Sequence, residues 1–172
     1  MSRNVQPSPM AFEIERKFLV RDLDAVALAA AAVDEFEIEQ TYLTGEPGES
    51  LRVRRSVRAD GAEERTETRK RRVSARTREE RERALGPDEY ERLVERRDPE
   101  RRTIHKRRFK VPLAGGLVCE IDVFGGELAG LVLAEVELPD EDASFALPEW
   151  LVIACEVTDD PAYTNSALAR RA

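Results

Sequence analysis

Residues 12–20 read FEIERKFLV, a stretch in which apolar and charged side chains alternate. Successive side chains of a β-strand point to opposite faces of the sheet, so this alternation predicts a strand with two different faces. One face holds Phe12, Ile14, Arg16, Phe18 and Val20, and the other holds Glu13, Glu15 and Lys17. The first face needs a hydrophobic core, whereas a charged face on a single strand is typical of an antiparallel sheet that meets water.

The same alternation returns in later segments, where polar residues two positions apart flank another side chain. The pairs are Arg52 and Arg54, Thr68 and Lys70, Lys106 and Arg108, Glu120 and Asp122, and Glu135 and Glu137, and the series Arg78, Glu80 and Glu82 alternates in the same way. A solvated face would mix Thr, Ser and Gln with charges of both signs within one strand. Because most pairs carry a single sign, we expect the strands to close into a barrel whose charged faces line the inside.

The composition fits one folded domain rather than a disordered chain. Of 172 residues, 41% are hydrophobic and 37% are charged, which leaves enough apolar surface to build a core. Residues 1–9 include two prolines and little apolar content. We therefore expect a disordered N-terminal tail over residues 1–9 and one domain over residues 10–172.

The sequence also favours one cellular location and disfavours a membrane span. Cys119 and Cys155 form neither a CxxC pair nor a metal-ligand pattern, which favours a reducing compartment and the cytoplasm. The longest apolar run, residues 23–33, is short, alanine-rich and interrupted by a charge, so we expect no membrane span. The N-terminus shows no basic region followed by an apolar segment, as a secretory signal would.

Charge is distributed unevenly along the chain. Residues 52–110 hold 19 Arg, 3 Lys and 13 Asp or Glu, a balance of +9, so the remainder carries −16 to give the total of −7. A basic segment is one sign of nucleic-acid binding. Here the arginines alternate with glutamates and no aromatic side chains are interleaved for base stacking, so we expect no nucleic-acid partner.

Turn and capping residues divide the chain into short strands and a few helices. Strands are expected near residues 11–20, 36–43, 50–58, 64–73, 76–84, 103–112, 117–124, 131–138 and 152–157. Helices are expected near 23–33, from 86 to about 97, and from 164 to the C-terminus. No internal repeat and no flexible linker interrupts this order.

Like charges gathered in a narrow interior repel each other unless groups of opposite sign lie among them. Acidic pairs suit hard divalent cations with oxygen ligands, and basic pairs suit an anion with many oxygens. A metal-bound polyphosphate satisfies both requirements.

Ordered motifs along the chain resemble the CYTH superfamily, also called the triphosphate tunnel metalloenzymes. The signature Glu-x-Glu-x-Lys strand is present as Glu13-Ile14-Glu15-Arg16-Lys17. The later motifs are QTYL at 40–43, LRVR at 51–54, KRRF at 106–109, EIDVF at 120–124, LAEVEL at 133–138 and EVTDDPAYTN at 156–165. Two places depart from the pattern. Lys70 lies in an arginine-rich stretch, and WLVIACEVT at 150–158 lacks the usual glycine and has two added residues, so both registers stay open.

The resemblance implies an α+β fold, an eight-stranded antiparallel β-barrel forming a triphosphate tunnel with helices packed outside. It assigns the site residues by position. The phosphate ligands would be Lys17, Arg52, Arg54, Lys70, Arg78, Lys106 and Arg108. The metal ligands would be Glu13, Glu15, Glu80, Glu82, Asp122, Glu135 and Glu137, with Glu120 and Glu156 as less secure candidates. Lys17 and Tyr42 match a lysine and a tyrosine that act as a catalytic pair in some inorganic triphosphatases of the family.

These expectations lead to a hypothesis about function. The protein would be a hydrolase that needs Mg²⁺ or Mn²⁺ and cleaves the terminal phosphoanhydride of a triphosphate. Inorganic triphosphate is the favoured substrate because no base-recognition motif is visible. A class IV adenylate cyclase and a non-catalytic module that binds polyphosphate or a nucleotide remain as alternatives, and the expected assembly is a monomer or a homodimer.

Overall fold

The computed structural model describes residues 14–72, 78–140 and 142–171. The predicted N-terminal tail and Glu13 lie outside the described residues, as does the side chain of Arg78.

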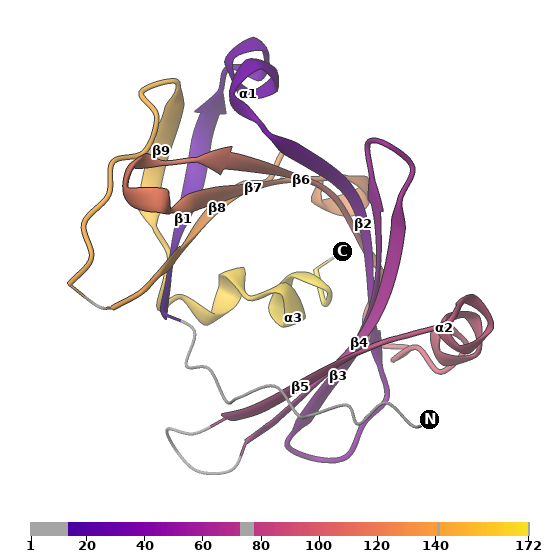
Figure 1. The fold of residues 1–172 in the computed structure, drawn as a ribbon. Helices are drawn as coiled ribbons and strands as arrows, with labels where there is room; N and C mark the ends of the chain where they lie inside the picture. The colour runs from indigo at the N-terminus through magenta and orange to yellow at the C-terminus, as the bar shows by residue number, and fades with distance from the viewer. Residues whose placement is uncertain (1–13, 73–77, 141, 172) are drawn as a thin grey trace, which may run out of the picture.

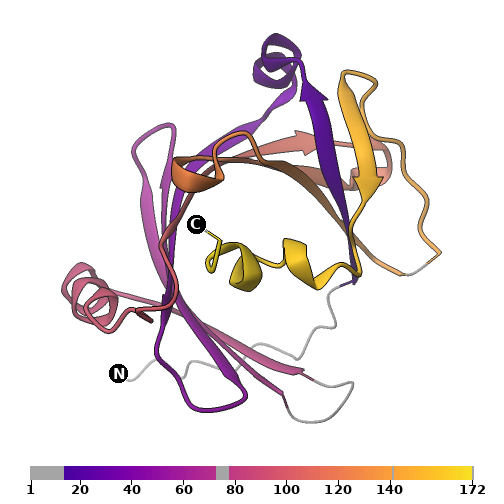
Figure 2. The same cartoon turned by 180° about the vertical axis from the view of Figure 1, so that it is seen from behind.

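The described residues form nine strands in one antiparallel sheet, in the order β5-β4-β3-β2-β6-β7-β8-β1-β9. The strands are β1 (Ile14–Leu23), β2 (Asp34–Leu43), β3 (Glu49–Arg58), β4 (Glu63–Arg72), β5 (Arg78–Ala84), β6 (Ile104–Pro112), β7 (Val118–Phe124), β8 (Val132–Leu138) and β9 (Leu151–Glu156). Short 3-10 turns η1 (Ala114–Gly116), η2 (Gly126–Leu128) and η3 (Pro161–Tyr163) lie between them and after β9. Figures 1 and 2 show that the sheet curls strongly, so that one of its two faces is concave. This concave inner side is called the hollow face.

The barrel is open, and this differs from the expected closed, eight-stranded tunnel. Across the described residues, β5 and β9 form the two edges of the sheet and do not pair with each other. The pairing of β1 with β9 is irregular, with register shifts between Leu19 and Val20 and between Val20 and Asp22. After β9 the chain turns into η3 and crosses the hollow face (Figure 1). The curl therefore ends at β9, so barrel is only an approximate description of this sheet.

Two helices lie on the outside of the curled sheet, as predicted. Helix α1 (Ala25–Ala31) begins after Asp24, whose carboxylate accepts hydrogen bonds from the backbone of Val26 and Ala27, a typical N-cap. Helix α2 (Pro87–Val94) begins with proline at its first position, where the missing N–H costs no hydrogen bond. Both helices lie against the outer surface in Figures 1 and 2.

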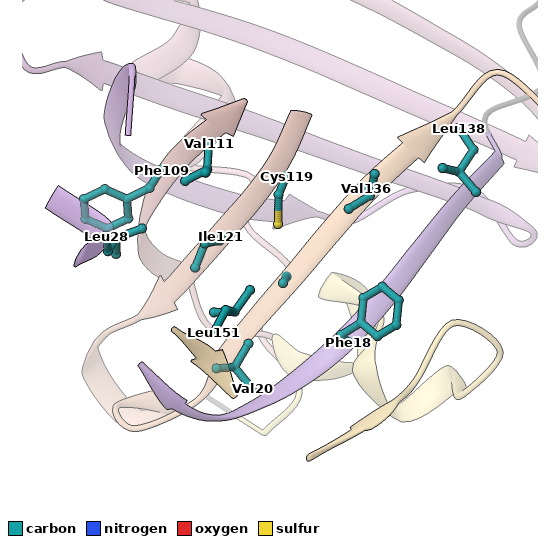
Figure 3. Close-up of a cluster of buried hydrophobic side chains, with 11 residues drawn as sticks. Phe18, Val20, Leu28, Phe109, Val111, Cys119, Ile121, Val136, Leu138 and Leu151 are labelled. Carbon is teal, nitrogen blue, oxygen red and sulfur yellow. The ribbon is translucent and has the colours of Figure 1, made fainter. Parts of the chain in front are cut away.

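The main hydrophobic core lies between the outer face of the sheet and α1. Figure 3 shows its buried side chains, which come from β1, β6, β7, β8, β9 and α1. Phe18 and Val20 belong to it, so the apolar face of the opening stretch packs as the alternation predicts. Trp150 is partly buried against the same cluster. A second outer cluster joins Leu51 and Val53 to Tyr90 of α2.

Helix α3 (Asn165–Leu168) lies inside the curled sheet, which corrects the prediction that the helices pack outside (Figures 1 and 2). Thr164 caps it, as its side chain accepts a hydrogen bond from the backbone of Ala167. At one end, the inner face of the sheet is apolar rather than charged. Leu168 packs there against Ile104 and Leu133, all almost fully buried. The helix is drawn inward because these inner side chains need an apolar cover.

Within the described residues, no helix is both long and apolar enough to span a membrane.

Candidate active site

The hollow face of the sheet encloses a cavity of about 850 Å³. Its wall comes from the inner faces of β1 to β8, and Thr164, Asn165 and Ser166 add a polar surface from the C-terminal segment. Most predicted site residues line it, namely Glu15, Lys17, Tyr42, Arg52, Arg54, Lys70, Glu80, Glu82, Lys106, Arg108, Glu135 and Glu137. The alternation of the strands therefore brings together residues that are up to about 120 positions apart (from 15 to 137).

The strand register places basic residues beside acidic ones across the wall. Lys17 is paired with Glu135 between β1 and β8, Arg108 with Asp122 between β6 and β7, and Lys70 with Glu80 between β4 and β5. Residues directly opposite each other in an antiparallel pair have neighbouring side chains. Opposite charges thus face each other in these three strand pairs, whereas Glu120 and Glu135 form a pair of like charge between β7 and β8.

Asp122 is the most deeply buried charge of the site and holds two basic side chains. It is 1% exposed, and Lys106 Nζ lies 2.5 Å from its Oδ2. Arg108 donates from Nε and Nη2 to the two carboxylate oxygens at 2.7 Å each. Burial opposes the charge on Asp122, but Lys106 and Arg108 overcome it and hold the pKa of its carboxyl well below the usual range. Burial lowers the pKa of Lys106 to about 8 despite the attraction of Asp122.

Arg108 also reaches Glu120 and Glu135, so one guanidinium joins three carboxylates. Burial works against its charge, but Asp122 and the two glutamates raise its pKa further above the ordinary arginine value. Arg108 is therefore a permanent cation at the centre of this wall.

Lys17 lies on β1, which pairs with β8, and is held in the same way. Its Nζ is 3.0 Å from Glu135 and 3.7 Å from Glu15. Burial disfavours the charge, but these carboxylates outweigh it and raise the pKa of Lys17. Lys17 is accordingly a charged ammonium, because its pKa lies above the ordinary lysine value.

The opposite wall, on β3 to β5, repeats the pattern with greater exposure. Lys70 lies 2.7 Å from Glu80, and Arg54 lies 3.7 Å from Glu82. Thr68 donates a hydrogen bond to Glu82 at 2.7 Å. Lys70 thus faces the cavity. The structure therefore shows the strand register around Lys70, which the arginine-rich sequence alone did not decide.

Arg52 and Tyr42 lie together where β2 meets β3. Arg52 lies directly opposite Tyr42 in the pairing of these strands, and its buried Nε has no hydrogen-bond partner among the described residues. Gln40 also donates to the Tyr42 hydroxyl at 3.3 Å. Burial raises the pKa of Tyr42, although Arg52, Arg101 and Lys17 oppose the increase. Tyr42 is therefore a neutral phenol at neutral pH.

The acidic side chains of the cavity could supply oxygen ligands to a divalent ion. Glu15, Glu120, Glu135 and Glu137 all line the cavity, and carboxylate oxygens suit Mg²⁺ and Mn²⁺. In the described part of the chain, no three acidic, histidine or cysteine side chains converge as a ready metal cluster. The ion pairs explain this, because Glu135 and Glu120 are turned toward lysine and arginine side chains.

Some residues predicted from the sequence lie elsewhere. Asp122 lies beneath Lys106 and Arg108 rather than on the cavity surface, so its role as a metal ligand stays a prediction. Glu156 bonds Arg16 on the outer side of β1, away from the carboxylates of the cavity. His105 is exposed on the outer face, near Glu39.

Sequence reasoning missed several residues of the cavity wall. Lys110 continues the spacing of Lys106 and Arg108 and pairs with Glu120 at 3.1 Å, so extending the alternation by one step would have found it. Asn165 and Ser166 carried no such signal, because their place depends on the path of α3 across the hollow face.

Comparison with known proteins agrees with this geometry, although no family model matches the chain. An inorganic triphosphatase from Nitrosomonas europaea is 36% identical over 159 residues, which cover 91% of this chain and 96% of that protein. An inorganic triphosphatase from Acetivibrio thermocellus is 49% identical over 71 residues, which cover 41% of this chain and 44% of that protein. The second match thus spans less than half of either protein.

Solved structures extend the comparison to the fold. The crystal structure of the inorganic triphosphatase NE1496 matches with a TM-score of 0.65 and 34% identity, covering 94% of this chain and 96% of that one. A putative adenylyl cyclase from Hippeastrum with a dominant triphosphatase activity matches with a TM-score of 0.52 and 17% identity, covering 75% of this chain and 80% of that one. At that identity the second likeness concerns the fold alone. Because the match with the Nitrosomonas enzyme runs through nearly the whole of both proteins, this chain belongs to the CYTH superfamily, the triphosphate tunnel metalloenzymes.

Proposed function

We propose that the protein is a divalent-metal-dependent inorganic triphosphatase that hydrolyses the terminal phosphoanhydride of its substrate. The observation that carries the proposal is the cavity wall, in which basic and acidic side chains lie side by side as ion pairs. A polyanion with bound cations is the ligand class that satisfies both signs at once. The name of the Nitrosomonas relative, which aligns with 91% of this chain, supports the same activity.

The basic side chains would hold the triphosphate oxygens. Arg52 is the strongest candidate for an early contact, because it lines the cavity and its Nε has no hydrogen-bond partner among the described residues. Guanidinium groups match phosphate oxygens with two parallel hydrogen bonds. The other phosphate-binding residues would be Lys17, Arg54, Lys70, Lys106 and Arg108, and the predicted contribution of Arg78 lies outside the described side chains.

The donor set fits a divalent metal ion, with Glu15, Glu135 and Glu137 as the principal ligands and Glu120, Glu80 and Glu82 as further candidates. The chemistry that Mg²⁺ or Mn²⁺ supplies in such enzymes is neutralisation of phosphate oxygens and a lower pKa for water. Glu135 would first have to leave Lys17 and Arg108, which it contacts at 3.0 and 3.3 Å. Lys17 would then lose its nearest carboxylate and could bind phosphate, whereas Arg108 would still hold Asp122 and Glu120.

Lys17 and Tyr42 would act as donors near the reacting phosphate. The raised pKa of Lys17 keeps it an ammonium, and the raised pKa of Tyr42 keeps the proton on its hydroxyl. A charged and a neutral donor suit the stabilisation of negative charge that develops on phosphate oxygens. Neither side chain, in this state, would accept the proton of the attacking water.

The direct test compares phosphate release from inorganic triphosphate, ATP and thiamine triphosphate, each with Mg²⁺ and with Mn²⁺. The proposal expects inorganic triphosphate to be hydrolysed with the highest kcat/KM. Formation of cyclic AMP and pyrophosphate from ATP would instead identify a class IV adenylate cyclase. Tight triphosphate binding without turnover would identify a non-catalytic binding module.

A further inference from the structure

The connector between α2 and β6, residues 95–103, folds back along the end of β2. Its Asp98 donates a backbone hydrogen bond to the carbonyl of Tyr42 at 2.9 Å. Thr44, just after β2, donates to the carbonyl of Arg96 at 3.2 Å. The backbone beside Tyr42 is thus held by a segment that contributes no side chain to the described cavity wall.

Arg101 of this connector joins three parts of the fold. Its guanidinium carbon lies 5.0 Å from the centroid of the Tyr42 ring, within the range of a cation–π contact. Its Nε lies 3.1 Å from the Asp98 carboxylate, and its Nη1 donates to the hydroxyl of Ser166 in α3 at 3.1 Å. A planar guanidinium suits this task because it presents several donors while stacking on an aromatic face.

The neighbouring Arg102 provides a natural comparison. Its side chain is 62% exposed and pairs with Glu127, whereas that of Arg101 is 17% exposed. The two residues have the same charge and lie in the same connector, but Arg101 alone of the two contacts Tyr42. The cations that face Tyr42 are Arg52 from β3, Lys17 from β1 and Arg101 from the connector.

We propose that Arg101 is a positioning residue for Tyr42 and couples the orientation of its ring to the C-terminal helix α3. The inference rests on the proposed function, in which the Tyr42 hydroxyl takes part in triphosphate hydrolysis. An ion pair with Asp98 and a hydrogen bond to Ser166 hold the guanidinium, and the guanidinium limits the movement of the ring. Arg101 is not among the residues that line the cavity, so its contribution passes through Tyr42.

This mode of action separates Arg101 from an arginine that merely stabilises the fold. The test measures kcat and KM for inorganic triphosphate in the Arg101→Gln variant, in Tyr42→Phe, and in the double variant. Displacing a reacting group slightly often lowers turnover strongly, so Arg101→Gln alone is expected to lower kcat by about tenfold or more with little change in KM. In the Tyr42→Phe background the same substitution is expected to lower kcat by less than about twofold.

Two further variants sharpen the comparison. Arg102→Gln is the matched control and is expected to leave kcat unchanged. Arg101→Lys keeps the charge but cannot hold Asp98 and Ser166 together, so its kcat is expected to lie between those of the wild type and Arg101→Gln. Equal losses from Arg101→Gln in the wild-type and Tyr42→Phe backgrounds would overturn the inference, because the effect would then not pass through Tyr42.

A spectroscopic measurement tests the coupling without using activity. The protein contains three tyrosines, and fluorotyrosine labelling gives each a ¹⁹F resonance, with that of Tyr42 assigned by its loss in Tyr42→Phe. Arg101→Gln and Ser166→Ala are expected to shift or broaden the Tyr42 resonance, and Arg102→Gln is not. An unchanged Tyr42 resonance in Arg101→Gln would overturn the inference, whether or not the wild type is active. Absence of phosphate release by the wild type would by itself refute only the proposed function.

Discussion

Replacing Asp122 with asparagine should destabilise the protein strongly, and increasingly as the pH falls. The carboxylate is 1% exposed and contacts both Lys106 and Arg108. Removing one partner of a buried ion pair leaves an uncompensated charge and typically costs about 3–5 kcal/mol. For a domain of this size that corresponds to a decrease in melting temperature of about 10 °C.

The pH dependence follows from Lys106. Its pKa is lowered from 10.5 to about 8 in the folded protein while Asp122 is present. Without Asp122 the pKa of Lys106 in the folded protein should fall further. Below pH 8, Lys106 of the folded wild type therefore keeps a proton that Lys106 of the folded variant has lost. The unfolded chains of both proteins bind that proton equally. As the pH falls below 8, the difference in unfolding free energy between the two proteins should therefore grow by about 1.4 kcal/mol for each pH unit. Above pH 8 the difference should be constant.

Urea unfolding of both proteins between pH 6 and 9, followed by circular dichroism, measures this difference. Glu120→Gln is the control, because Glu120 is more exposed and shares Arg108 with two other carboxylates, so its loss should cost only about 1 kcal/mol. Adding Lys106→Met to the Asp122→Asn variant should recover much of the stability. A difference below about 1 kcal/mol at pH 7, or one that stays constant between pH 6 and 8, would refute the reasoning.

Further predictions address the metal, its ligands and the outer face of the sheet. Excess EDTA should abolish triphosphate hydrolysis, since unneutralised carboxylates would repel the substrate, and undiminished turnover would contradict a metal requirement. Glu135→Gln should lower kcat by at least about tenfold with an unchanged circular dichroism spectrum, and wild-type turnover would remove Glu135 from the metal set. Hydrogen bonds from Arg16 and Thr158 lower the pKa of Glu156 from 4.5 to about 2. Its stabilising effect should be complete above pH 4.5 and lost as the pH falls through 2. The melting temperatures of the wild type and Glu156→Gln should therefore converge near pH 2, and a constant gap would contradict the Arg16 contact.

Alternation along each strand predicted which side chains line the cavity. Arg16 and Lys17 are neighbours in sequence, yet Lys17 lines the cavity and Arg16 lies outside over the ring of Phe18. This result needs no knowledge of the fold, because the period of a strand alone decides which face a side chain occupies. The strand ranges read from the sequence also correspond to the nine strands of the described residues, whereas the resemblance to the family implied eight.

The remaining features depend on contacts between distant parts of the chain. Ser166 meets Arg101 across 65 residues, and no local pattern indicates that α3 should turn into the hollow face. Its apolar side chains suited an outer or an inner surface equally well. The position of α3 is decided by the apolar inner end of the sheet around Ile104 and Leu133. This apolar surface forms only when the strands are assembled. The open edge between β5 and β9 is likewise a property of the assembled sheet.

An exchange of ion pairs would link metal binding to triphosphate binding. Lys17, Lys70 and Arg108 each hold a carboxylate in the structure. A metal ion alone would take carboxylates from these cations, and triphosphate alone would take cations from the carboxylates. Both ligands together would satisfy every group, so they should bind with positive cooperativity.

The most direct test of this account is the melting temperature of the protein with Ca²⁺, with inorganic triphosphate and with both, while orthophosphate release is followed to confirm that the ligand persists. Ligand at about 100 times its dissociation constant adds roughly 2.7 kcal/mol of stability, or about 5–10 °C in a domain of this size. The increase in melting temperature with both ligands should exceed the sum of the two separate increases, and orthophosphate in place of triphosphate should give little increase. No shift with the two ligands together would contradict the claim that the charged strand faces form a metal-triphosphate site.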